Sequence, residues 1–152
     1  MKRRTLKITG TSPATPSTAI IGSIVGGLSV YDWFTIDASL VGATGGTLDV
    51  YLQRQVALAE EVSGGVWVDW LHYAQLADGA SAVVYSCQTG TDTTIRTVGA
   101  FSTDASVGTP VLAANTFAGG HPGHAIRCVG VAGADTTVGA AVTIYLGCFD
   151  NA

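Results

Sequence analysis

Alternation of apolar and polar residues with a period of two is the feature that most constrains how this chain can fold. It is clearest in residues 47–54, where Leu48, Val50 and Leu52 are separated by polar or aromatic residues. Successive side chains of a β-strand point to opposite faces, so this pattern predicts a strand with one face against the core. A pair of glycines directly precedes the segment and indicates a turn.

Two segments near the C-terminus, residues 125–131 and 143–148, have the same pattern. The residues predicted to face inward are Ile126, Cys128, Ile144, Leu146 and Cys148. Arg127 and Tyr145 are predicted to lie on the opposite faces of these strands. The link over residues 132–138 is rich in turn-forming residues, so we expect the two strands to form an antiparallel hairpin.

Six further segments are short, apolar and bounded by Gly, Thr, Ser or Asp, and we predict that each is a strand. They are residues 19–30, 33–40, 66–75, 82–89, 94–99 and 111–116. Eight or nine strands at this spacing favour an all-β, antiparallel, jelly-roll-like sandwich, because a parallel sheet would need crossover helices. The one segment with helix-forming residues, 54–62, is equally compatible with the tip of a long hairpin.

The composition agrees with a single β-rich domain. The chain has 152 residues, of which 47% are apolar and only 12% charged. It contains 20 glycines, 21 alanines and 19 threonines, but only two lysines and two glutamates. This balance argues against a disordered chain, a coiled coil and a protein that coats nucleic acid. A chain of this length hides roughly 70% of its extended surface on folding, which is enough for a core without disulfide staples.

Charge is unevenly distributed along the chain. Four of the seven basic residues lie at the N-terminus: Lys2, Arg3, Arg4 and Lys7. The rest of the chain has three arginines and all eleven acidic residues, a net charge of −8, so nucleic acid and anionic lipid should repel it. We therefore expect neither a nucleic-acid nor a membrane partner, and a basic terminus that is able to contact an acidic neighbour.

Residues 1–18 are expected to form an extended arm in front of a sandwich that spans residues 19–152. The segment is basic and then rich in Thr, Ser and Pro, and Pro13 and Pro16 favour extended backbone. Its first residues, MKRR, resemble the start of a signal peptide, but polar residues follow them and glycines interrupt the next apolar run. We expect no cleaved signal and no transmembrane span.

No group of residues in the sequence predicts catalysis or a bound cofactor. The three cysteines, Cys87, Cys128 and Cys148, are odd in number and widely spaced, which favours buried thiols over disulfides or a zinc site. His121 and His124 lie in the segment GGHPGH, where a tight turn is a simpler interpretation than a metal site. His72 would need a carboxylate such as Asp69 to act in catalysis, and we favour a strand histidine that faces solvent or a neighbour. We predict no enzyme activity, no metal and no cofactor.

The aromatic residues of the first half of the chain offer a different interpretation. Outward-facing Trp and Tyr side chains of a sandwich are able to stack on sugar rings or to form a subunit interface, whereas inward-facing ones fill the core. Trp67 and Trp70 are three residues apart, so one of them must face outward if the strand is regular. Together with Tyr51, that residue would form a glycan-binding platform.

Four segments resemble a known family. They are residues 47–53 (TLDVYLQ), 66–76 (VWVDWLHYAQL), 112–120 (LAANTFAGG) and 125–133 (AIRCVGVAG). They look like small β-sandwich proteins that are encoded among the virion structural genes of tailed bacteriophages, and the similarity extends from Trp33 to Leu146. The resemblance implies a non-enzymatic, capsid-associated protein such as a head decoration (cement) protein. Residues 54–63 depart from the family pattern, in which a shorter Asp- and Gly-rich turn is expected.

These features together predict a phage virion structural protein. We expect a capsid decoration protein on the exterior of the head, assembled in the host cytoplasm. It would form a homo-oligomer, with a trimer favoured, and bind the major capsid protein or another virion protein. The residues predicted to contact partners are Lys2, Arg3, Arg4, Lys7, Pro13, Pro16, Tyr51 and Trp70. The alternatives are a glycan-binding module of a tail or head fibre and a structural component of the neck or tail.

Overall fold

A computed structural model of the protein describes residues 3–13, 17–41, 46–57, 66–76, 83–88, 102–103, 112–118, 121–133 and 141–150. The regular structure of these residues is ten β-strands: β1 (Arg3–Thr11), β2 (Thr18–Val25), β3 (Trp33–Val41), β4 (Leu48–Ala57), β5 (Val66–His72), β6 (Val83–Gln88), β7 (Ser102–Thr103), β8 (Thr116–Phe117), β9 (Ile126–Ala132) and β10 (Ala141–Phe149). Eight strands have six or more residues, whereas β7 and β8 have two each. The predicted all-β chain of eight or nine strands is confirmed by the eight longer ones.

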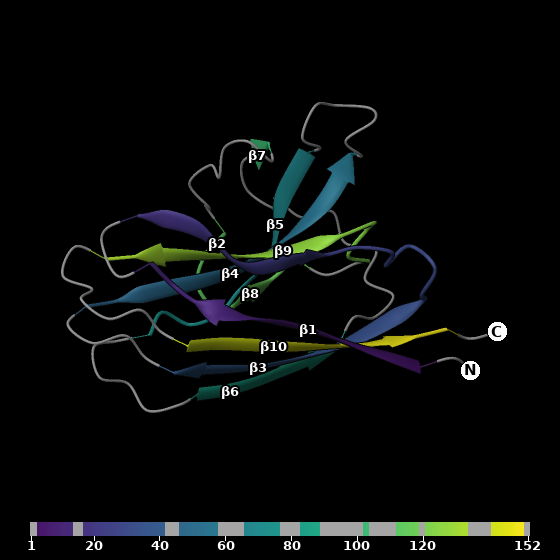
Figure 1. Ribbon diagram of the computed structural model, residues 1–152, viewed down its shortest axis with the longest axis horizontal. Helices are drawn as coiled ribbons and strands as arrows, with labels where there is room; N and C mark the ends of the chain where they lie inside the picture. Colours follow the sequence, from purple (N-terminus) through teal and green to yellow (C-terminus); the bar gives the residue numbers. More distant parts are fainter. Residues whose placement is uncertain are drawn as a thin grey trace.

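The strands form two antiparallel sheets that pack face to face (Figure 1). The four-stranded sheet has the order β1-β10-β3-β6. The six-stranded sheet has the order β2-β9-β4-β5-β7, and β8 also pairs with β5. Each sheet contains strands from both halves of the chain. From β1 to β4, the chain passes to the other sheet after every strand. This order is the double Greek key of a jelly roll, as predicted.

The prediction that the last two long strands, β9 and β10, form a hairpin is wrong. β9 pairs with β2 and β4, whereas β10 pairs with β1 and β3 in the other sheet. The period-two pattern determines which face of a strand is buried, and it carries no information about which strand lies beside it. The connection between β9 and β10 therefore crosses from one sheet to the other.

The N-terminal segment belongs to the sandwich, and its separation as an arm over residues 1–18 is corrected here. β1 pairs with β10 along its whole length, from Arg3 opposite Phe149 to Thr11 opposite Ala141. The expected extended backbone is present, but Ile8 is only 2% exposed and packs in the core. Burial of the apolar side chains of Leu6 and Ile8 in the core stabilises the position of this basic strand in the sheet.

The core lies between the two sheets and is built from alternate residues of the predicted strands. The residues predicted to face inward from β4, β9 and β10 are all buried: Leu48, Val50, Leu52, Ile126, Cys128, Ile144, Leu146 and Cys148. Both described cysteines are free thiols, and burial raises the pKa of Cys128 to about 12 and that of Cys148 to about 11. Such pKa values are typical of structural rather than reactive cysteines.

The other predicted strands differ from the observed ones mainly at their ends. β2 ends at Val25, and β4 continues to Ala57, so the first residues of the segment 54–62 are strand. The strand predicted over residues 111–116 is wrong, because residues 112–115 form a loop and a turn and only Thr116 lies in a strand, β8. The strand predicted at 94–99 lies outside the described residues. In the part of the chain that the structure describes, no helix is long and apolar enough to cross a membrane.

Candidate functional site

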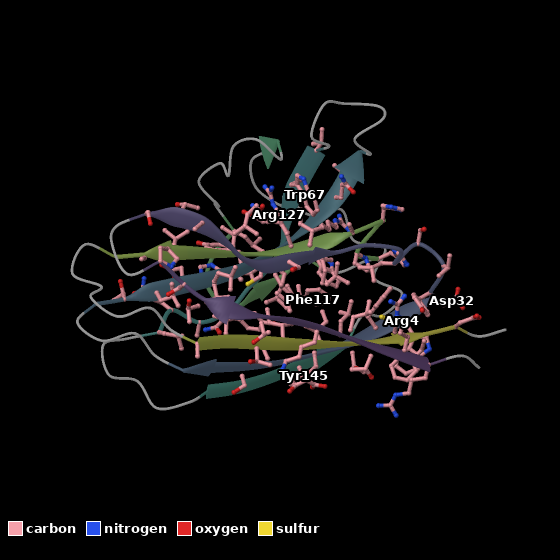
Figure 2. The ribbon with its side chains drawn as sticks, in the orientation of Figure 1. Arg4, Asp32, Trp67, Phe117, Arg127 and Tyr145 are labelled. Atoms are coloured by element: carbon pink, nitrogen blue, oxygen red, sulfur yellow. The ribbon has the colours of Figure 1, made fainter. Side chains whose placement is uncertain are left out.

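Strand β1 presents the predicted basic residues at the edge of the four-stranded sheet. Arg3 and Lys7 point to the outer face of this sheet. Arg4 points to the opposite face, at the end of the sandwich near the two termini (Figure 2). All three side chains are exposed. Within the described residues none of them has a carboxylate oxygen within 4.0 Å. These cations are therefore available to an external anionic partner.

Two rows of side chains cross the outer face of this sheet. Their residues Arg3, Lys7, Trp33, Tyr145 and Phe149 are called the basic–aromatic face. In the first row the guanidinium carbon of Arg3 lies 5.5 Å from the centre of the Phe149 ring, which stacks on Trp33 at 3.8 Å. In the second row Nζ of Lys7 lies 5.6 Å from the centre of the Tyr145 ring. Both cations lie within the cation–π range of about 6 Å, so each is held over a ring.

The row between these two is flat because its central residue is Gly147. Thr5 and Thr35 lie opposite it on the neighbouring strands. A Cβ atom at position 147 would overlap Oγ1 of Thr35 and lie 3.2 Å from the Phe149 ring. A side chain here would therefore displace the ring over which Arg3 lies.

The aromatic residues predicted to form a glycan platform are buried, which corrects that prediction. Tyr51 is 7% exposed, Trp67 1% and Trp70 0%. Trp67 does face outward, but it lies against the guanidinium of Arg127 (Figure 2). The pairing of β4 with β5 shifts register at Trp70, which packs into the core with its ring centre 5.4 Å from that of Phe117. No flat aromatic surface is formed by these residues.

A buried polar network, missed from the sequence, lies on the outer face of the six-stranded sheet. Nε of Arg127 donates to Oε1 of Gln53 at 2.8 Å, and the Gln53 amide donates to Oδ1 of Asp69 at 2.8 Å. Oδ2 of Asp69 accepts the backbone N–H of Leu112 at 3.1 Å. The guanidinium carbon of Arg127 lies 4.6 Å from the centre of the Trp67 ring. The three polar side chains are at most 1% exposed, so the network is covered by chain and not by solvent.

His72 contacts the same covering segment and also Asp49 of β4. Its Nδ1 lies 2.7 Å from the carbonyl oxygen of Leu112, and its Nε2 lies 3.1 Å from Oδ1 of Asp49. Both neighbours are hydrogen-bond acceptors. The ring stacks on Tyr51 at 3.8 Å, and burial together with the charges of Asp49 and Asp69 raises the pKa of Tyr51 to about 12. His72 thus faces a neighbour, and His72 and Asp69 both contact the backbone of Leu112.

An open groove of about 730 Å³ lies at the end of the sandwich where β1 begins and β10 ends. Its walls come from residues 29–32 ahead of β3, residues 54–56 of β4 and residues 121–124 ahead of β9. The described residues of the GGHPGH motif, 121–124, therefore form one wall of the groove.

His121 and Gly123 determine the shape of that wall. Nδ1 of His121 accepts the Gly123 N–H at 2.9 Å, so its Nε2 carries the proton and donates to the carbonyl oxygen of Tyr31 at 2.7 Å. Gly123 has a φ of +77°, and a Cβ atom there would lie 2.5 Å from the carbonyl oxygen of Gln55. Gly123 forms an isolated bridge with Gln55, the chain bends at His124, and both ring nitrogens of His121 are engaged. Among the described residues no three His, Cys, Asp or Glu side chains form a group able to hold a metal.

Of the residues predicted to contact partners, Arg3 and Lys7 share one exposed face, and Arg4 lies at the adjacent end of the sandwich. Pro13 is half-buried in the connection between β1 and β2, whereas Lys2 and Pro16 lie outside the described residues. The aromatic partners of Arg3 and Lys7 were missed. The alternation in residues 143–148 did indicate that Tyr145 faces outward, and the structure confirms this.

No protein-family model, curated protein or solved structure matches this chain. The interpretation of the basic–aromatic face and of the groove therefore rests on their own geometry and charge.

Proposed function

We propose that the protein is a non-enzymatic structural component of a tailed-phage virion. Its simplest role is that of a capsid decoration protein on the head exterior. It attaches through the basic–aromatic face to an acidic surface of the major capsid protein or of another virion protein. One observation carries the proposal: Arg3 and Lys7 lie exposed on one face, each over an aromatic ring, without a carboxylate partner in the described part of the chain. Residues 8–152 have a net charge of −8, so basic residues are concentrated on this strand, and Asp37 lies opposite Tyr145 in the same row as Lys7.

The chemistry of this face suits a protein partner. Arginine and aromatic residues are enriched at interfaces, and charge-assisted hydrogen bonds to carboxylates are stronger than neutral ones. A long cationic side chain that already lies over a ring loses less conformational freedom on binding than one that is free in solvent. The face therefore combines apolar area with two oriented donors.

The jelly roll supports the same class of function, because viral capsid and lectin domains use this architecture. The resemblance of four segments to small β-sandwich virion proteins of tailed bacteriophages points in the same direction. Fold alone does not determine function, so the proposal depends on the face.

Self-association, with a trimer favoured, is part of the proposal. Charged residues on an edge strand oppose the addition of a further strand, so β1 favours contact through its face over edge-to-edge pairing. Light scattering from the purified protein tests this part, and a monomer at all concentrations contradicts it.

Deletion of residues 2–16 does not test this function cleanly, because it removes β1. The suitable variant is Arg3→Gln with Lys7→Gln, which changes exposed side chains alone. The measurement is co-sedimentation with virions that lack this protein. We expect at least about a tenfold loss of affinity, since two charge-assisted contacts are removed. Arg4→Gln, on the same strand but on the other face, should bind within about twofold of the wild type. Equal binding by the double variant contradicts the proposal.

The glycan-binding alternative is not favoured, because Tyr51 and Trp70, the residues on which it depended, are buried. A neck or tail component would use the same face, and the location of the protein on the particle distinguishes it from a head protein.

A further inference from the structure

Arg54 brings a positive charge into the groove without a matching carboxylate. Its side chain is half-buried, and its Nη1 donates to the carbonyl oxygen of His121 at 2.8 Å. Its Nε is buried and has no hydrogen-bond partner. Among the described residues no carboxylate oxygen lies within 4.0 Å of the guanidinium. Desolvation lowers the pKa of Arg54, which reflects the cost of burying a charge without a counter-ion.

The walls around this guanidinium are tied together. Leu28 N–H donates to the carbonyl oxygen of His124 at 3.0 Å, and Gln55 N–H donates to that of Ala125 at 2.9 Å. The bonds from Arg54 and from the His121 ring, described above, join the same three segments. Because the segments are already connected, a ligand would not have to order the groove, and preorganised sites bind with a smaller entropic loss.

The rest of the lining offers donors and few competing anions. The side chains of Ser29, Tyr31, Gln55 and His124 line the groove and make no hydrogen bonds among the described residues. Asp32 is the one acidic residue of the lining, and it is already engaged. The volume of about 730 Å³ lies within the range of sites that bind small ligands or single side chains, roughly 300–1,000 Å³.

We propose that this groove binds a carboxylate group, with Arg54 as its principal donor. The planar guanidinium matches a carboxylate with two parallel N–H···O bonds. A single guanidinium, with no second permanent cation in the lining, suits a monoanion better than a doubly charged phosphate. The net charge of −4 repels anions at a distance, so affinity depends on this local contact. The carboxylate belongs either to an acidic peptide segment or to an acidic sugar.

Titration of the ¹⁵N-labelled full chain, followed by amide NMR, tests this inference with three probes. The probes are glutamate blocked at both ends, glucuronate and inorganic phosphate. We expect saturable shifts of the Gln55, His121 and Gly123 amides with at least one carboxylate. The carboxylate that binds more tightly identifies the source as peptide or sugar. Absence of saturable shifts with both carboxylates, or tighter binding of phosphate than of either, overturns the proposal.

Variants locate the binding at Arg54. Arg54→Gln should weaken carboxylate binding about tenfold or more. Because this change also removes the bond to His121, Arg54→Lys serves as a second variant that retains the charge but lacks the planar fork. We expect weaker binding than in the wild type here too, and unchanged affinity in both variants refutes the role of Arg54. The control Arg3→Gln should leave the titration unaltered. The groove is thus tested separately from attachment to the virion.

Discussion

Arg3 and Arg127 are the same residue type in the same kind of contact, and their surroundings give them opposite roles. Each guanidinium lies against an aromatic ring, at 5.5 Å from Phe149 and 4.6 Å from Trp67. Arg127 is 0% exposed and also bonds Gln53, whereas Arg3 is exposed on an edge strand. A buried charge is bound to its neighbours, and an exposed one remains available to a partner.

Replacement of these two arginines should therefore have very different effects on stability. We predict that Arg127→Ala lowers the free energy of unfolding by about 3–5 kcal/mol, because it leaves buried polar partners unsatisfied. Arg3→Ala should change it by no more than about 0.5 kcal/mol. Urea denaturation followed by tryptophan fluorescence measures both values. Similar effects of the two substitutions would contradict the assignment of Arg127 to a covered network.

Gly123 is the residue on which the groove wall depends. Gly123→Ala should destabilise the protein by about 2 kcal/mol or more, since its φ is +77° and the added Cβ meets the carbonyl oxygen of Gln55. Gly26→Ala is the matched control, because a Cβ there meets nothing within 4 Å. Thermal unfolding of both variants compares them, and equal melting temperatures would show that the wall tolerates a side chain.

Three buried side chains that lose a proton at alkaline pH, Tyr51, Cys128 and Cys148, make the free energy of unfolding depend on pH in that range. The pKa of Tyr51 is about 12 against 10.0, and the pKa values of Cys128 and Cys148 are about 12 and 11 against 9.0. The folded chain holds these protons more tightly than the unfolded chain does. Their contribution is therefore fully present below the unfolded pKa values and is lost as pH rises toward the folded ones.

We predict that the free energy of unfolding falls between about pH 9 and pH 12. Above about pH 10, Tyr51→Phe should remove up to about 2–3 kcal/mol of this fall. Urea denaturation at a series of pH values measures the slope for both proteins. If the slopes coincide, the tyrosine hydroxyl does not titrate from a buried position.

At the scale of elements, strand β1 both packs on the core and presents charge to solvent, and alternate residues serve these two roles. Arg3, Thr5 and Lys7 face outward, whereas Ile8 and Leu6 pack on the core. The strand therefore attaches to the sheet through one face and presents charge on the other.

Truncation and point substitution should separate these tasks. We predict that Ile8→Ala destabilises the protein by about 2–5 kcal/mol, and that deletion of residues 2–16 is more damaging because it also exposes β10. Thr5→Ala, on the outer face of the same strand, should cost less than about 1 kcal/mol. Chemical denaturation of the three variants checks this order. A deletion variant as stable as the wild type would mean that β1 is an arm after all.

Strand faces were predictable and strand neighbours were not. The alternation in residues 47–54, 125–131 and 143–148 identified the buried face of β4, β9 and β10, because burial acts on each strand separately. The placement of β9 and β10 in different sheets depends on partners far away in sequence. For the same reason strand β1 was not predicted. Its segment is basic and Pro-rich, and it contributes just two residues, Leu6 and Ile8, to the core.

At the scale of the whole molecule, the two sheets differ in what covers their outer faces. The six-stranded sheet carries a polar network under Leu112, whereas the four-stranded sheet has Arg3, Lys7 and Tyr145 exposed on its outer face. Asp69 and Arg127 alternate with apolar residues just as solvent-exposed polar residues do. The local sequence therefore does not distinguish a covered sheet face from an exposed one. The candidate groove likewise joins residues more than 60 positions apart, Arg54 and His121, which no motif in the sequence connects.

An image of the purified virion at side-chain resolution tests the proposed attachment most directly. We predict many copies at symmetry positions on the head exterior, with Arg3 and Lys7 against carboxylates of a neighbouring protein. Copies whose basic–aromatic face points to solvent, or particles that contain none of this protein, would contradict it.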